Sequence, residues 1–490
     1  MAKIVTIIDI GSNSVRMVIY EKTSRFAFHL LHEEKSKVRI SENAYKHNGE
    51  LQDVPMQRTF DALQDFLEIS NSFKSRKVLC VATSALRDAP NQKVFLQRVK
   101  QKLGLKIKVI SGEKEAYFGA ISCANLLPQQ RDAMSIDIGG GSTEIAFIDK
   151  DNVSDTLSLK LGTVRLKELY FDHNDIDGAI TYIDKELEKL PAKNITTLIG
   201  IGGTFRAVSS AIQKLQCYPL EKLHAYEYNI DIFQNYLTQV LQASNTQELK
   251  QLNIKNDRFD VIKPGVLVLQ RVIHKLNISH IITSGVGVRE GVYLSDLLRN
   301  SKHKFPANYN TSVRYLLDTH IKNKNFSNNL NSLVKKIFDM THEYFGIDKK
   351  YRYELSVAAK LYPAGSSIHF YSQHKHTYYL IQTALEYGFS HKSIMLIATL
   401  NKYTKSKLPA QSHLQKYKTL LPDTYTINVL SYILSLSIAL LSHRPRNIDF
   451  DITFANHTLF IHSKKKLYLA QETLKKLECS HKDFQVSFQS

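Results

Sequence analysis

Two short segments of this 490-residue chain each place a carboxylate directly ahead of a turn rich in glycine and serine. The first, D-I-G-S-N-S, begins at Asp9; the second, D-I-G-G-G-S, begins at Asp137 and continues to Glu144. Turns of this composition expose backbone N–H groups that bind phosphate oxygens, and glycine lets the main chain approach the ligand closely. A carboxylate beside such a turn favours phosphate only when a hard cation such as Mg²⁺ lies between the two. The segments therefore predict a site for a phosphorylated ligand and a divalent cation.

The repetition of this pattern is more informative than either copy. A single glycine-rich turn could be an ordinary hairpin, but the copies match in aspartate, glycine and serine, and each lies between two strand-like runs. Two strand–turn–strand copies about one domain apart indicate two similar halves that face each other. We expect the facing turns to bind phosphate through the following residues: Gly11, Ser12, Asn13, Ser14, Gly139, Gly140, Gly141, Ser142 and Thr143.

Two further glycine turns follow strand-like runs later in the chain. The first is I-G-G-T-F-R-A at 201–207, and the second is T-S-G-V-G-V-R-E-G at 283–291. Four such turns are more specific than one, because each repeats the order of strand, glycine turn and polar side chain. We expect weaker substrate contacts from these two turns, through Gly202, Gly203, Thr204, Arg206 and Arg289.

The elements that must position these residues change type along the chain. Up to about residue 300, short β-like runs alternate with helical patterns, which is typical of α/β layers. A polar segment containing Pro and Asn, 301–310, predicts a linker, after which a helical pattern follows; strand-like alternation returns near residue 446. These changes predict four domains: 1–128, 129–300, 311–445 and 446–490.

The net charge of +19 is distributed unevenly along the chain. Residues 301–490 contain 26 Lys and Arg against 12 Asp and Glu, so +14 of the excess lies there. A basic surface attracts polyanions, although a basic, solvated surface without a partner would have the same composition. The four cysteines form no C-x-x-C pair, and neither a signal peptide nor a membrane-spanning run is present. We therefore expect a cytoplasmic protein.

The exact strings and their order resemble one family. The residues that carry the resemblance are 8–16 (IDIGSNSVR), 81–89 (VATSALRDA), 109–119 (VISGEKEAYFG), 136–144 (IDIGGGSTE) and the two later turns. They resemble the exopolyphosphatase/guanosine pentaphosphate phosphohydrolase (Ppx/GppA) family, within the superfamily of actin, sugar kinases and heat-shock chaperone ATPases. The resemblance implies an α/β fold with two actin-like (ribonuclease H-like) lobes flanking a cleft. An α-helical HD-like domain and a small α+β C-terminal domain would follow.

The resemblance also implies roles for individual side chains. Glu115 matches the family's general base, which positions and deprotonates the attacking water. Asp137 and Glu144 match its metal-binding carboxylates, and Asp9 is their counterpart on the facing wall. Arg87 matches an arginine that faces the cleft and holds phosphate oxygens.

Each of these roles has a simpler alternative. Glu115 could only complement the dipole of the helix in which it lies, and Glu113, two residues earlier, is a rival base. Arg87 could pair with its neighbour Asp88. Arg16 could belong to a structural salt bridge, so we leave it outside the predicted site.

The helical domain departs from the family pattern. The resemblance implies a His-Asp pair near residues 361–365, but the sequence there reads L-Y-P-A-G, while His374 and His376 remain in Q-H-K-H. Neutral imidazoles need companion ligands to hold a metal tightly. We therefore expect these histidines to be structural and this domain to hold no second catalytic metal.

The resemblance implies a hydrolase that uses Mg²⁺, with Mn²⁺ as an alternative. Its substrate would be inorganic polyphosphate, the alarmone pppGpp, or both, and the charge excess in the C-terminal part favours a long polyanion. Two other functions stay open: a kinase or ATPase of the same superfamily, and a sensor of polyphosphate or alarmone. We expect a homodimer, by analogy with the family's larger members, and neither membrane nor nucleic-acid binding.

Overall fold

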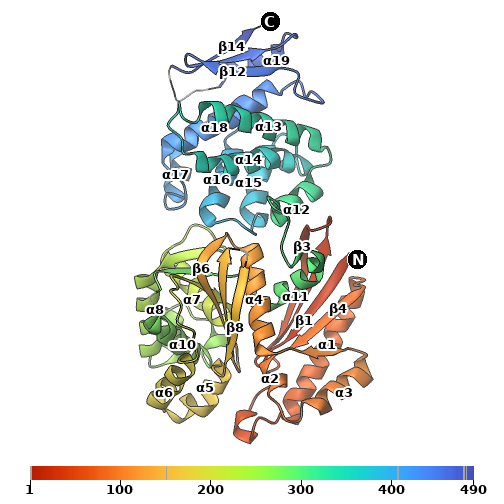
Figure 1. Ribbon diagram of the computed structural model, residues 1–490, viewed down its shortest axis with the longest axis vertical. Coiled ribbons are helices and arrows are strands. Elements are labelled where there is room, and N and C mark those ends of the chain that lie inside the picture. Colours follow the sequence, from red (N-terminus) through yellow and green to blue (C-terminus); the bar gives the residue numbers. More distant parts are fainter. Residues whose placement is uncertain are drawn as a thin grey trace. The chain divides into compact units, whose positions relative to one another are not determined.

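The computed structural model of the chain describes residues 3–150, 152–276, 278–404, 408–477, 481 and 483–489. Two compact units form, Met1–Tyr309 and Asn310–Ser490 (Figure 1). Their boundary falls within the predicted linker at 301–310. The finer division into four domains stays a prediction.

The first sheet of the amino-terminal unit has five strands in the order β3-β2-β1-β4-β5. β1 is central, pairing antiparallel with β2 and parallel with β4. The sequence of β1 is an almost continuous apolar run, as expected of a strand that is covered on both faces. Ile8 and Ile10 join a core with α1 (Asp53–Ser72) and α3 (Gln92–Leu103). Helix α11 (Val288–Leu297) also packs against β1. The strands are β1 Ile4–Ile10, β2 Val15–Lys22, β3 Phe28–Ser36, β4 Lys77–Ala82 and β5 Ile107–Val109.

The second sheet has six strands in the order β10-β11-β9-β6-β7-β8. Like the first sheet, it combines an antiparallel hairpin with parallel neighbours: β6 pairs antiparallel with β7 and parallel with β9. Ile136 and Leu198 belong to a core that these strands share with α7 and α10. The strands are β6 Gln130–Ile138, β7 Thr143–Lys150, β8 Asn152–Leu159, β9 Thr197–Ile201, β10 Tyr226–Asn229 and β11 His280–Thr283.

The duplicated sequence segment forms the same hairpin in both sheets. β1 and β2 pair so that Asp9 lies opposite Arg16, and β6 and β7 pair so that Asp137 lies opposite Glu144. The prediction of two actin-like α/β halves is therefore confirmed, and each aspartate stands at the end of the first strand of its sheet.

Two helices lie between the sheets (Figure 1). α4 (Gly112–Leu126) packs against β6, β7 and β8, whereas α11 (Val288–Leu297) packs against β1, and the two helices pack against each other. The remaining α-helices of this unit are α1 Asp53–Ser72, α2 Ser84–Arg87, α3 Gln92–Leu103, α5 Thr163–Leu169, α6 Ile176–Leu187, α7 Gly202–Leu215, α8 Ile230–Gln242, α9 Thr246–Gln251 and α10 Ile262–Lys275.

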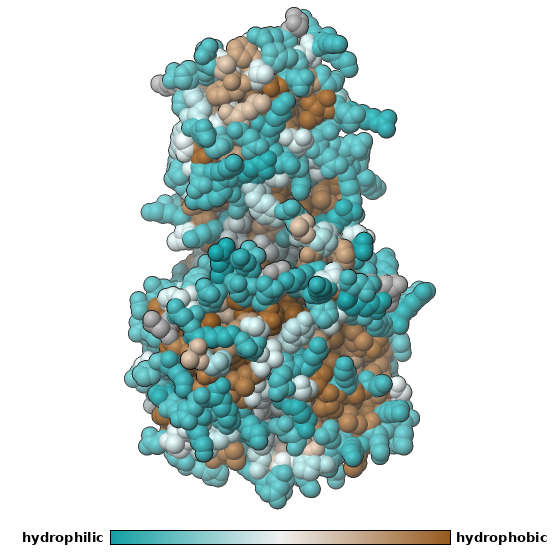
Figure 2. Space-filling model, in the orientation of Figure 1, coloured by the Kyte–Doolittle hydropathy of each residue, from teal (hydrophilic) through white to brown (hydrophobic). Residues whose placement is uncertain are grey.

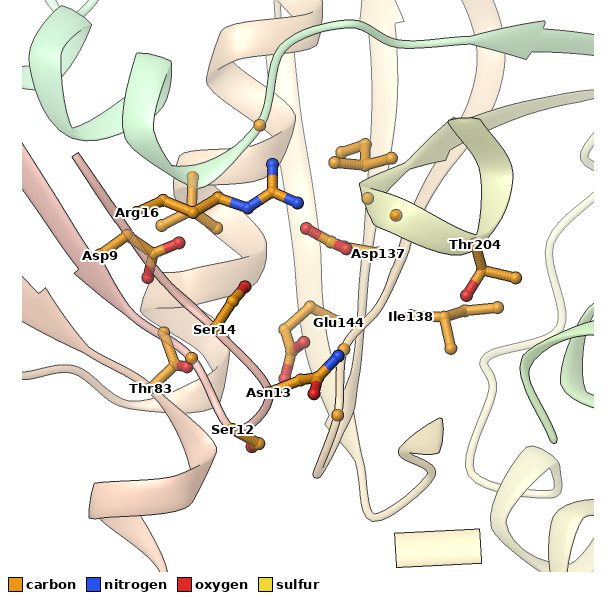
Figure 3. A pocket seen from close by; sticks show the side chains of 18 of the residues that line it. Asp9, Ser12, Asn13, Ser14, Arg16, Thr83, Asp137, Ile138, Glu144 and Thr204 are labelled. Carbon is orange, nitrogen blue, oxygen red and sulfur yellow. The ribbon is translucent and has the colours of Figure 1, made fainter. Parts of the chain in front are cut away.

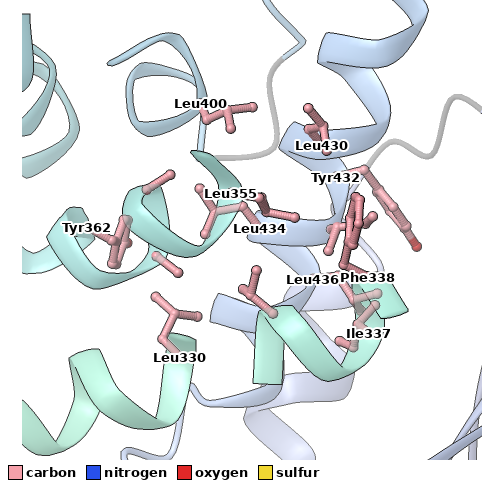
Figure 4. Close-up of a cluster of buried hydrophobic side chains, with 14 of the residues drawn as sticks. Leu330, Ile337, Phe338, Leu355, Tyr362, Leu400, Leu430, Tyr432, Leu434 and Leu436 are labelled. Atoms are coloured by element: carbon pink, nitrogen blue, oxygen red, sulfur yellow. The ribbon is translucent and has the colours of Figure 1, made fainter. Parts of the chain in front are cut away.

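The second unit is helical and ends in a three-stranded sheet, as predicted. α18 (Thr424–Leu440) is apolar on nearly every face and lies in the core, where Leu430, Leu434 and Leu436 meet Leu330 and Phe338 (Figure 4). No described helix of the protein is long and apolar enough to cross a membrane. The other elements are α12 Thr311–His320, α13 Lys324–Thr341, α14 Arg352–Leu361, α15 Gln373–Ala384, α16 His391–Lys402, α17 Gln411–Lys416, β12 Asp451–Ala455, β13 Thr458–His462, α19 Tyr468–Leu474 and β14 Gln485–Gln489.

The face of the protein seen in Figure 2 is mainly hydrophilic. Hydrophobic residues appear on it as separate small areas rather than as one continuous band. The described apolar side chains are therefore concentrated in the cores beneath this face.

Candidate active site

The two glycine turns of the first unit face each other across a pocket of about 150 Å³ (Figure 3). The turns have the same geometry: the Gly11 N–H donates to the Ser14 carbonyl at 3.2 Å, and the Gly139 N–H donates to the Ser142 carbonyl at 2.9 Å. Most residues of the predicted site line this pocket, namely Asp9, Gly11, Ser12, Asn13, Ser14, Glu115, Asp137, Gly139, Gly140, Glu144, Gly202, Gly203, Thr204, Arg206 and Arg289.

Close approach of the two turns explains two of the glycines. A Cβ atom on Gly140 would lie 2.7 Å from the Cβ of Ser12 on the opposite turn, so a larger residue would push the turns apart. Gly202 has φ +87°, and a Cβ there would collide with Oδ1 of Asp137. These glycines therefore let the walls of the pocket approach each other closely.

Asp9 and Asp137 lie on opposite walls of the pocket. Oδ1 of Asp9 is buried and has no hydrogen-bond partner among the described residues. Burial raises the pKa of Asp9 to about 6, with Asp137 and Glu290 adding to the rise and Arg289 and Arg16 opposing it. Burial also raises the pKa of Asp137. A divalent cation bound between the two walls would give Oδ1 of Asp9 a ligand bond and would offset the charge of both carboxylates.

Asp9, Asp137 and Glu144 do not form a metal site by themselves. Within the residues that the structure describes, no group of three or more His, Cys, Asp or Glu side chains is close enough to hold an ion. Mg²⁺ is commonly bound by one or two carboxylates together with waters and substrate phosphates. The donor set on the two walls fits that mode, and the assignment of all three carboxylates to one ion stays a prediction.

Glu115 lies inside the pocket wall, whereas its rival Glu113 does not. Both residues are in the first turn of α4, but Glu113 is exposed and Glu115 is 8% exposed and lines the pocket. Burial raises the pKa of Glu115 well above its usual value; the nearby carboxylate of Glu144 raises it further, and Arg87 opposes the rise. The geometry therefore favours Glu115 over Glu113.

Arg87 lies behind Glu115 rather than in the pocket lining. Its Nη1 donates to Oε2 of Glu115 at 2.9 Å and its Nη2 donates to the Ser142 hydroxyl at 3.3 Å, while Asp88 is 3.6 Å from its Nε. The expected alternative, a pair with Asp88, is thus present beside the bond to Glu115. Arg87 connects the general-base candidate to the second glycine turn.

Glu144 accepts hydrogen bonds from two serines. The hydroxyls of Ser142 and Ser158 donate to its Oε1 at 2.6 and 2.9 Å. Burial raises the pKa of Glu144 to about 7, and these hydroxyls limit the rise. Nη2 of Arg87 lies 3.8 Å from the same oxygen, and the carboxylate is close enough to Glu115 to raise the pKa of that residue.

Four predicted phosphate-binding residues do not line the pocket: Arg87, Gly141, Ser142 and Thr143. Thr143 is fully buried and its hydroxyl donates to the carbonyl of Leu161 at 2.6 Å, which is a structural bond within the second half. Thr143 therefore supports the turn from behind.

Arg16 is the main functional candidate that the sequence analysis left out. It extends from β2 toward Asp137 over the space beside Asp9 (Figure 3). Among the described residues it makes no hydrogen bond or ion pair, so a structural salt bridge is not observed. Burial lowers its pKa to about 10, and Arg206 and Arg289 lower it further. The only sequence signal was its position directly after the first turn.

Arg206 and Arg289 lie close to Arg16 and form with it a group of three among the four arginines that line the pocket. Arg206 donates to the carbonyl of Gly285 at 3.1 Å, and Arg289 pairs with Glu33 at 2.6 Å. Three guanidinium groups so close together repel one another, which suits a polyanion that would lie between them. Other pocket residues that were not predicted are Lys35, Thr83, Ser84, Ile138, Thr163, Ile201, Arg258, Gly287, Val288 and Glu290.

In the second unit, the segment that replaces the expected His-Asp pair is tied to α15 by hydrogen bonds. The side chains of Gln373 and Thr377 donate to the carbonyl of Tyr362 at 2.9 and 3.0 Å, and the N–H of Gly365 donates to the Thr377 hydroxyl at 2.9 Å. The absence of a metal role for His374 and His376 stays a prediction.

Comparison with known proteins matches both units of the chain to the same family. The Ppx/GppA phosphatase family matches residues 18–300, and its domain III matches residues 310–486. A guanosine-5'-triphosphate,3'-diphosphate pyrophosphatase of Photobacterium profundum is 26% identical, with 93% of this chain and 90% of that protein aligned. The crystal structure of the Aquifex aeolicus member of the Ppx/GppA family is 27% identical, covers 61% of this chain and 99% of that one, and has a TM-score of 0.54. The fold also matches an exopolyphosphatase from Cytophaga hutchinsonii at 23% identity, with 62% and 100% of the two chains covered and a TM-score of 0.57.

Proposed function

Because the chain belongs to the Ppx/GppA phosphatase family, we propose that it hydrolyses a terminal phosphoanhydride bond and releases orthophosphate from pppGpp or inorganic polyphosphate. The observation that carries this proposal is the position of Glu115, a buried carboxylate in a pocket that also contains two matching phosphate turns and four arginines. A buried carboxylate beside anion-binding groups can activate water next to a bound phosphate.

Glu115 is the general base of the proposed reaction. The oxygen of a water molecule attacks the terminal phosphorus, the bond to the bridging oxygen breaks, and the water proton passes to Glu115. Its raised pKa makes the carboxylate a stronger base than an exposed glutamate. Arg87 fixes the orientation of that carboxylate through the 2.9 Å bond to Oε2. The shortened chain leaves carrying the electron pair of the broken bond.

The backbone N–H groups of the two turns and the three arginines bind the phosphates. Arg16 has no hydrogen-bond or ion-pair partner in the described chain, so its donors are available to phosphate oxygens. Arg206 and Arg289 lie beside it and add positive charge where negative charge accumulates on the leaving group.

Asp9 and Asp137 would hold the divalent cation, with Glu144 as a further ligand on the second wall. When bound, Mg²⁺ or Mn²⁺ would neutralise phosphate charge and polarise the phosphorus–oxygen bonds. The cation would also satisfy the orphaned Oδ1 of Asp9.

Phosphate release from pppGpp and from long-chain polyphosphate, each with Mg²⁺ and with EDTA, tests the proposal. Glu115→Gln should lower the rate by roughly 10²- to 10⁴-fold while substrate binding persists. Glu113→Gln is the matched control, because it lies in the same helical turn but outside the pocket, and it should retain the rate.

Three outcomes would contradict the proposal. Loss of rate in Glu113→Gln but not in Glu115→Gln would show that the base is misassigned. Tight binding of either substrate without release by the wild type would support a sensor, and phosphoryl transfer to an added hydroxyl acceptor would support a kinase. The cytoplasmic location and the homodimer stay predictions.

A further inference from the structure

A second cavity of about 110 Å³ adjoins the active-site pocket. The two share Ser12 and Asn13 of the first phosphate turn, so a ligand can extend from one into the other. Val164 and Val261 line the second cavity and give it apolar surface from the second half. A cavity of ~150 Å³ is known to hold one benzene ring, so a two-ring base would occupy this smaller space only together with part of the adjoining pocket.

The charged groups of the second cavity are paired, with one exception. Arg39 pairs with Asp260 at 2.8 Å, and Lys167 pairs with Asp172 at 2.6 Å. Lys46 also lies 3.6 Å from Asp172. Glu168 is the exception: no salt bridge joins it to another described residue.

Among the described residues, one carboxylate oxygen of Glu168 accepts a hydrogen bond and the other does not. It is 7% exposed, and its Oε1 accepts a hydrogen bond from the backbone N–H of Asn43 at 3.0 Å. Its Oε2 is buried, and no hydrogen bond joins it to another residue that the structure describes. Burial raises the pKa of Glu168, and the backbone N–H groups of Asn43 and Tyr45, together with Lys46 and Lys167, oppose the rise. An ionised carboxylate can only accept hydrogen bonds, so the missing partner must be an N–H or O–H donor.

We propose that the second cavity binds the nucleobase of the substrate, and that Oε2 of Glu168 accepts a hydrogen bond from an N–H of guanine. The proposal rests on the function proposed above and names its substrate class. Guanine offers N–H donors on one edge of a planar ring, and the valines would contact its faces. Polyphosphate offers no such donor, and its phosphates would be repelled by an unpaired carboxylate. The cavity therefore favours pppGpp over polyphosphate.

Binding of ppGpp and of inorganic tripolyphosphate to the full chain tests this proposal by calorimetry, independently of turnover. Glu168→Gln keeps an oxygen that can accept from Asn43 but removes the charge, and Glu168→Ala removes both. A hydrogen bond to a charged group is worth ~1.5–3 kcal/mol, so each variant should bind ppGpp roughly 10- to 150-fold more weakly. Tripolyphosphate binding should be unchanged or tighter, and kcat/KM for pppGpp should fall while that for polyphosphate does not.

Glu42→Gln is the matched control, since Glu42 lines the same cavity but is already paired with Arg58 and Arg39. It should leave the ratio of ppGpp to tripolyphosphate affinity unchanged. Equal weakening of both ligands by Glu168→Gln, no weakening of ppGpp, or no ppGpp binding by the wild type would overturn the proposal. If the wild type binds ppGpp through Glu168 but releases no phosphate from any substrate, the nucleobase site stands and the hydrolase proposal fails.

Discussion

Replacing Asp9 by Asn should stabilise the metal-free protein at neutral and basic pH. The pKa of Asp9 rises from an ordinary value of 3.8 to about 6, chiefly because the carboxylate is buried. A difference of roughly 2.2 units corresponds to ~3 kcal/mol. The folded protein binds this proton more tightly than the unfolded chain, so the charged form lowers stability as pH rises through 6. Asparagine imitates the protonated group at every pH and removes that cost.

The difference in stability between the Asp9→Asn variant and the wild type should therefore depend on pH. With ~2.1 cal/mol/K per residue for the unfolding entropy, the unit Met1–Tyr309 gains about 5 °C in melting temperature at pH 8. At pH 4.5, where the folded wild type is already protonated at Asp9, the gain should shrink to about one third. Thermal unfolding in EDTA at the two pH values measures both differences.

Asp65→Asn provides the control, because Asp65 is exposed on α1 of the same unit. It should change the melting temperature little at either pH. Equal stabilisation by Asp9→Asn at pH 8 and 4.5, or destabilisation at pH 8, would refute the argument, because the buried charge would then not be the cause. Added Mg²⁺ should raise the melting temperature of the wild type more than that of the variant, since Asp9 is a proposed ligand.

Three further predictions concern the same pocket. Asp137→Asn should raise the Mg²⁺ concentration needed for half-maximal phosphate release, and an unchanged titration would exclude Asp137 as a ligand. Arg16→Ala should lower kcat/KM by roughly tenfold or more, the value of a charge-assisted hydrogen bond, while the chain stays folded, because no hydrogen bond or ion pair joins this arginine to another described residue; an unchanged kcat/KM would exclude a phosphate contact from Arg16. Gly140→Ala should lower activity while the chain stays folded, because its Cβ would lie 2.7 Å from Ser12 on the facing turn, and full activity would show that the turns separate freely.

The phosphate turns could be predicted because their signal is local. Aspartate, glycine and serine stand next to one another in the chain, and the conformation that exposes their N–H groups depends on those same residues. The duplication then implied two facing halves, which both sheets confirm. Alternation of β-like and helical runs was likewise enough to give the fold class.

The choice between Glu113 and Glu115 as the general base required the tertiary structure. Glu113 and Glu115 share a helical turn and a charge, but residues two apart point roughly 200° away from each other on a helix. Only the packing of α4 between the sheets decides that Glu115 faces the pocket.

By itself, the sequence determined that this protein has an α/β pair of phosphate-binding halves, a helical unit and a set of carboxylates that suits a divalent cation. The tertiary structure alone decided which charges lack partners. Arg16 and Glu168 are ordinary residue types in the sequence, and each becomes informative only because no described side chain forms an ion pair with it. A missing partner is a property of everything that packs around a group, so no local pattern of residues can reveal it.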